Sequence, residues 1–139
     1  MKMSRIVTRG ILFLTVAIVC VACASAQPGT VVPIQQSDLA SLAGVWNGWA
    51  YAGADGFPGE MTLRPDGYFT NSVGAFTSTG TFQIVNGALV ASPYTSGGVS
   101  AVAEQTTTVQ LIVKNGQQYL SGSGRGYSGG PYTFEYKKR

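Results

Sequence analysis

The sequence has no histidine, and its only two cysteines, Cys20 and Cys23, lie near the N-terminus. Histidine is the usual general base and the commonest metal ligand, so its absence excludes a Ser-His-Asp triad and disfavours most metal sites. Residues 27–139 contain no cysteine, which excludes thiol catalysis, thiolate metal sites and disulfides there. The six acidic residues are scattered and show no pattern of a catalytic pair or a calcium loop. We therefore expect a protein that is not an enzyme, with no catalytic residue, no metal site and no cofactor.

A long apolar run is also missing, because the segment 11–22 spans about twelve residues and a membrane-crossing helix needs about twenty. Basic residues precede this segment, and the small residues Ala24-Ser25-Ala26 follow it, which is the pattern of a cleavable signal peptide. We predict a signal peptide over residues 1–26 and a periplasmic or secreted bacterial protein. The alternative is lipidation at Cys23, in which case acyl chains would anchor the protein to a membrane.

The charge balance changes once the predicted leader is set aside. The whole chain has nine basic and six acidic residues, but Lys2, Arg5 and Arg9 lie in the leader. The remaining charges cancel, so the basic composition of the whole chain does not indicate a nucleic-acid partner.

The remaining chain is rich in glycine and in turn signals. Asn86-Gly87 and Asn115-Gly116 are strong signals for two-residue hairpins, and Pro65-Asp66-Gly67 is typical of a turn. Apolar and polar residues alternate between the turns, as they do in half-buried strands. We predict strands over residues 43–52, 59–64, 68–73, 78–85, 88–92, 106–114, 117–124 and 131–137, with a further short strand over 99–104.

About eight short strands with short connections predict an all-β, antiparallel, up-and-down barrel, because closure removes the exposed sheet edges. A barrel of this strand number has room for its own side chains or for one small ligand. We expect an extended N-terminal arm over 27–41, in which Ser37 or Asp38 begins a helical turn, and a β-barrel domain over 42–139.

The first predicted strand contains Gly44-Val45-Trp46, which resembles the Gly-x-Trp signature of lipocalins and related calycin barrels. The resemblance implies that Trp46 plugs one end of the barrel and that a basic residue near the chain end packs across its ring. The wider pattern resembles small exported bacterial domains that have no settled activity. Its elements are Leu42 to Gly48, Asp66-Gly67, Gly80-Thr81-Phe82, Asn86-Gly87 and Tyr132 to Tyr136. The terminal Lys137, Lys138 and Arg139 lie where the basic partner of Trp46 is expected.

This lipocalin-like resemblance implies a binding protein for a small apolar or amphipathic ligand. The alternative is an interaction module that binds a protein of the cell envelope, since the chain also resembles exported metalloprotease inhibitors that act through an arm such as 27–41. In a regular strand, Trp49 and Tyr51 lie on the opposite face from Trp46, and we expect them to contact the ligand or partner.

Overall fold

The computed structural model describes residues 29–96, 99–100, 106–126 and 129–139. The predicted signal peptide and Cys23 lie outside these residues, as do residues 101–104 of the strand predicted over 99–104. In the part of the chain that the structure describes, no helix is both long and apolar enough to cross a membrane.

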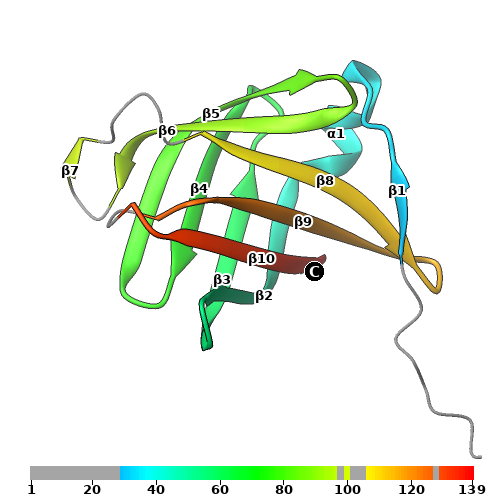
Figure 1. Cartoon of the computed structure of the whole chain (residues 1–139). Coiled ribbons are helices and arrows are strands. Elements are labelled where there is room, and N and C mark those ends of the chain that lie inside the picture. Colours follow the sequence, from blue (N-terminus) through cyan, green and yellow to red (C-terminus); the bar gives the residue numbers. More distant parts are fainter. Residues whose placement is uncertain (1–28, 97–98, 101–105, 127–128) are drawn as a thin grey trace, which may run out of the picture.

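Eight antiparallel strands form a closed up-and-down barrel (Figure 1), which confirms the predicted fold class. Each strand pairs with the next one along the chain, and pairing of the last strand with the first completes the barrel. The barrel strands are β2 (Gly44–Ala52), β3 (Asp55–Leu63), β4 (Tyr68–Val73), β5 (Phe76–Val85), β6 (Ala88–Ser96), β8 (Thr107–Lys114), β9 (Gln117–Arg125) and β10 (Pro131–Lys138). The two-residue strand β7 (Val99–Ser100) pairs with β6 outside the closed ring.

The segment before the barrel is packed against it. Strand β1 (Thr30–Val32) pairs with the second half of β8, and β6 pairs with the first half. Along β8, the pairing with β1 takes over where the pairing with β6 stops, so this edge of β8 is covered along most of its length. The 3-10 helix η1 (Gln36–Asp38) and the short helix α1 (Leu39–Leu42) follow, at the place where the sequence predicts a helical turn.

Both Asn-Gly hairpins form as predicted. Asn86 has φ of 50° and Asn115 has φ of 49°, and the glycine after each of them also has positive φ. This pair of left-handed residues defines a type I′ turn, whose twist matches that of the flanking strands. The two turns therefore fix the register of β5 with β6 and of β8 with β9.

A row of three aromatic rings on β10 fills much of the barrel interior. Tyr132, Phe134 and Tyr136 point inward, with ring centroids 6.1 Å and 4.6 Å apart along the row. Glycines on neighbouring strands make room for them: a Cβ on Gly59 would lie 2.7 Å from Tyr136 Cε1, and a Cβ on Gly122 would collide with the ring of Phe134. Glycine is unfavourable inside a strand, so these positions are explained by the close approach of the rings.

Candidate functional site

One end of the barrel is closed by Trp46. The side chain is fully buried, and its Nε1 donates a hydrogen bond of 2.9 Å to the carbonyl oxygen of Leu42 at the end of α1. Lys138 Nζ lies 5.6 Å from the centre of the indole ring and donates to the carbonyl oxygen of Ser41. A cation above an indole face is a favourable contact. The helix, the first barrel strand and the chain end are therefore joined at this end.

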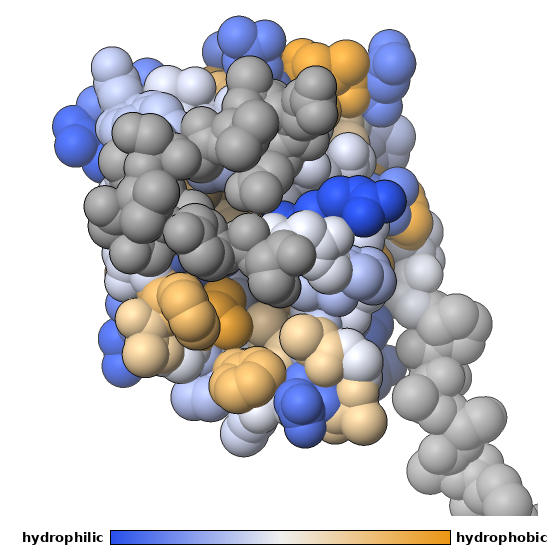
Figure 2. Space-filling view, turned by 60° about the vertical axis from the view of Figure 1, so that its left-hand side comes forward, coloured by the Kyte–Doolittle hydropathy of each residue, from blue (hydrophilic) through white to orange (hydrophobic). Residues whose placement is uncertain are grey.

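The opposite end holds a cavity of about 480 Å³. It lies where β2 ends and β3 begins, and where β4 turns into β5. Hydrophobic side chains gather on this face of the molecule (Figure 2), and Phe57 and Phe76 at the cavity are 42% and 60% exposed. The apolar lining residues are Ala50, Phe57, Val73, Ala75, Phe76 and Pro93.

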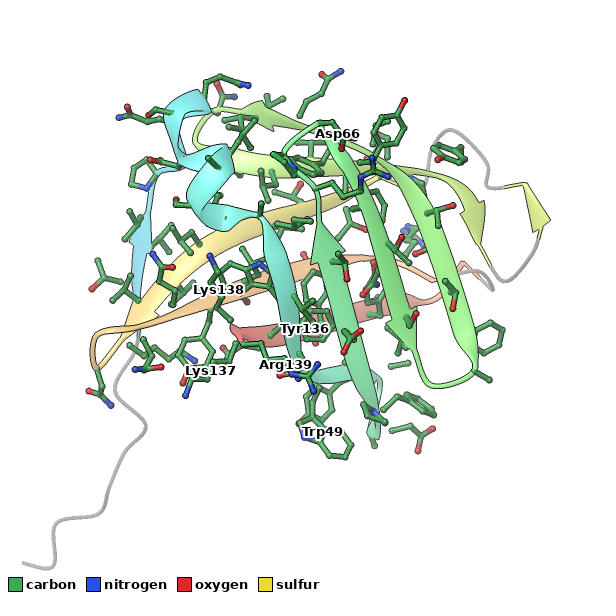
Figure 3. All side chains as sticks on the ribbon, turned by 180° about the vertical axis from the view of Figure 1, so that it is seen from behind. Trp49, Asp66, Tyr136, Lys137, Lys138 and Arg139 are labelled. Atoms are coloured by element: carbon green, nitrogen blue, oxygen red, sulfur yellow. The ribbon has the colours of Figure 1, made fainter. Side chains whose placement is uncertain are left out.

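The inner wall of the cavity carries polar side chains that differ in their hydrogen bonding. The hydroxyl groups of Thr107 and Tyr132 share a hydrogen bond of 2.9 Å. Asn71 also lines the cavity and is only 7% exposed, yet its Oδ1 has no hydrogen-bond partner. The hydroxyl of Tyr136, which lies inside the barrel (Figure 3), is also buried, and its contact with the Asn71 side chain is too loose for a regular hydrogen bond. Such unpaired groups are rare in protein interiors, because each costs about 1–3 kcal/mol.

The two inward-facing tyrosines are neutral at physiological pH. Burial raises the pKa of Tyr132, and its hydrogen bond with Thr107 offsets part of that increase. Burial also raises the pKa of Tyr136, as does the neighbouring Tyr132, while the nearby Asn71 amide acts in the opposite direction. Both phenols therefore present neutral hydroxyl groups to the interior.

Arg125, the last residue of β9, is the charged residue of the cavity lining in the described part of the chain. Its Nη1 donates a hydrogen bond of 3.0 Å to the carbonyl oxygen of Gly129, which holds the side chain beside the mouth. No acidic side chain lines the cavity among the described residues, and Arg125 has no ion-pair partner there. Among the described residues, the charge that lines the mouth is therefore positive.

The structure separates the two contact residues that the sequence predicts. Trp49 and Tyr51 are 53% and 47% exposed, and both rings lie against Gly56, where a Cβ would be 3.0 Å from Tyr51 Cε1 and 3.6 Å from Trp49 Cε3. Tyr51 reaches the mouth and contributes to the cavity lining, whereas Trp49 projects from the outer surface (Figure 3). Of the two residues, Tyr51 is therefore the one placed to touch a molecule in the cavity.

Sequence reasoning missed Asn71, Thr107 and Arg125. Asn71 alternates with Phe69 and Val73 on β4, so a polar residue on an inward apolar face was the available signal. Thr107 and Arg125 carry no comparable signal, because each becomes part of the site only when the barrel closes.

No cluster of three or more potential metal-ligating side chains occurs among the described residues. The chain was also compared with known proteins: no family model matches it, and no curated protein or solved structure is significantly similar to it.

Proposed function

We propose that the protein is a non-enzymatic, exported, lipocalin-like barrel that binds one small apolar or amphipathic molecule in the cavity at its open end. The observation that supports this function is the cavity itself. Its volume of about 480 Å³ falls within the range of small-molecule sites, and its wall combines apolar side chains with a few polar groups.

The contrast between the two barrel ends also supports a binding function. Trp46 and its neighbours fill the closed end, where the core residues Leu42 and Leu120 are fully buried as well. The opposite end leaves a cavity of about 480 Å³, although a protein interior is normally close-packed. A barrel that had only to be stable would gain from larger side chains at positions such as Ala50.

The test is binding of N-phenyl-1-naphthylamine, a neutral apolar probe whose fluorescence rises in an apolar site. We expect saturable binding of one probe per chain. Ser78→Phe places a ring in the cavity and should weaken probe binding by about tenfold or more. Thr81→Phe makes the same type of change on the exposed face of the same strand and is the matched control.

Phe57→Ser provides a second test that does not depend on overpacking the interior. Phe57 is partly exposed at the mouth, so its loss should weaken probe binding while the circular dichroism spectrum stays unchanged. The proposed function would be ruled out if the probe did not bind the wild-type protein, or if it bound Ser78→Phe and Phe57→Ser as tightly as the wild-type protein.

The arm is a less suitable functional element than the cavity. Residues Thr30–Val32 are held in a strand, and Ile34 is buried in the core, with its backbone N–H bonded to the Gly87 carbonyl at 2.8 Å. An inhibitor that acted through this segment would first have to detach it from the barrel. We therefore place the binding function in the cavity.

Export is a separate part of the proposal and has its own measurement. The intact mass of the protein recovered from its native host should correspond to a chain that begins at Gln27. A chain that begins at Cys23 and carries acyl groups would instead show membrane anchoring. Native mass spectrometry of the same sample would reveal a retained molecule.

A further inference from the structure

The cavity wall has a different polar chemistry at its two ends, and this difference indicates which class of molecule it takes. Asn71 lies on the inner wall, two residues further into the barrel than Val73 at the β4–β5 hairpin. Arg125 lies at the mouth, where β9 ends. The apolar lining residues Phe57 and Phe76 belong to the hairpin ends at the same opening.

The inner end requires a neutral group that can both donate and accept hydrogen bonds. The Asn71 amide contains a donor and an acceptor, and the neighbouring Tyr136 hydroxyl can act as either. Asn71 lines the cavity, and its buried Oδ1 has no hydrogen-bond partner, while Thr107 and Tyr132 are already bonded to each other. A carboxylate could not donate to Asn71 Oδ1, and no cation lines this part of the cavity to neutralise it. A hydroxyl or an uncharged amide can donate the hydrogen bond that Asn71 Oδ1 lacks.

The mouth of the cavity, in contrast, favours a negatively charged group. Arg125 uses one N–H to bond the Gly129 carbonyl, and the guanidinium carries further donors. Because no acidic residue lines the cavity among the described residues, an anion at the mouth meets a single fixed positive charge. A carboxylate is well matched to this group, since charge-assisted bonds to arginine are among the stronger hydrogen bonds.

We propose that the cavity takes an elongated hydroxy-acid: an apolar chain with a hydroxyl at its inner end, bonded to Asn71, and a carboxylate at its outer end, beside Arg125. The inference rests on the proposed function and adds the chemical class and the orientation of the ligand. It explains why the Asn71 oxygen remains without a partner in a mostly apolar cavity.

The experiment compares three ten-carbon molecules as competitors of N-phenyl-1-naphthylamine. These are 10-hydroxydecanoate, decanoate, which lacks the hydroxyl, and 1-decanol, which lacks the carboxylate. The hydroxy-acid should displace the probe about threefold to tenfold more effectively than either of the others, as expected for one added hydrogen bond or ion pair.

Substitutions then assign each preference to its residue. Asn71→Leu should remove the preference for the hydroxy-acid over decanoate, and Arg125→Gln should remove its preference over 1-decanol. Ratios within each variant are compared, so a general change in affinity does not affect the result. The matched controls Gln110→Leu and Arg64→Gln, which alter exposed residues away from the cavity, should keep both ratios.

Asn71→Ala removes the same acceptor without adding bulk, so it replaces Asn71→Leu if that variant does not fold. It too should reduce the preference for the hydroxy-acid over decanoate. If the probe binds but either ratio is near one in the wild-type protein, or survives the matching substitution, the inference is wrong and the proposed function stands. If the probe itself does not bind, both are wrong.

Discussion

Replacing Trp46 with alanine tests whether the closed end of the barrel stabilises the whole fold. The indole is fully buried, bonds the Leu42 carbonyl through Nε1 and lies under the Lys138 ammonium group. Removing a buried tryptophan costs about 3–5 kcal/mol in lost burial and residual cavity. Natural domains have about 5–15 kcal/mol of total stability, so the variant should lose a large part of it.

The assay is urea unfolding followed by circular dichroism, which does not depend on tryptophan fluorescence. At a slope typical of small domains, a loss of 3–5 kcal/mol shifts the midpoint by roughly 2 M or more. Trp49→Ala is the matched control, because the same residue type is 53% exposed there and should cost about 1 kcal/mol or less. A loss below about 1 kcal/mol for Trp46→Ala would show that Trp46 does not act as a core plug.

Two further predictions concern the interior row of rings. Tyr136→Phe should raise stability at neutral pH by about 1 kcal/mol, since it removes a buried hydroxyl that lacks a regular hydrogen bond, and should reduce alkaline unfolding. The pKa of Tyr136 is raised in the folded state, so its contribution to stability is full below about pH 10. As the pH rises from there toward the pKa of the folded state, the contribution is lost by up to about 1.4 kcal/mol per pH unit. Circular dichroism against pH measures the effect, and identical alkaline transitions of the two proteins would contradict it. Gly59→Ala should lower the free energy of unfolding in urea by about 1–3 kcal/mol, because the added Cβ would meet the Tyr136 ring. In the control Gly126→Ala, the nearest atom to the added Cβ lies at 3.7 Å, so stability should change by less than about 0.5 kcal/mol. Equal effects of the two substitutions would refute the packing argument.

Most of the barrel could be predicted because its turns have strong local chemistry. The Asn-Gly hairpins set the register of their strands, and strand β4 has the bounds that the pattern predicts. Strand β3 begins earlier than predicted, at Asp55, in a stretch where Gly56 and Pro58 disfavour a strand. This stretch forms a strand because it pairs with the end of β2, which is a tertiary effect.

Strand β6 shows the same limit of local reasoning. It continues through Pro93, a residue that normally ends a strand, because a register shift opposite Thr79 and Gly80 creates a bulge there. Strand β1 was missed for a different reason. Three residues between prolines are too few to show alternation, and the strand exists only because β8 has an uncovered edge.

The candidate site could not be predicted for a related physical reason: the residues of a barrel cavity come from strand ends that meet only on closure. Asn71, Thr107 and Arg125 lie on three different strands, and no spacing in the sequence links them. The aromatic residues of the first barrel strand were the easier indication of a contact site. Tyr51 and Trp49 are similarly exposed, however, so exposure does not show that Tyr51 lies at the mouth and Trp49 on the outer wall.

The two ends of the barrel use their aromatic residues in different ways, and this difference is the strongest reason to look for a ligand. At the closed end, the polar atom of Trp46 is bonded and its ring is covered by Lys138. At the open end, Phe57 and Phe76 remain exposed, and Asn71 remains unpaired. Exposed rings and an unpaired buried amide are each unfavourable in a free protein. One amphipathic molecule in the cavity would relieve both, since it would cover the rings and bond the amide.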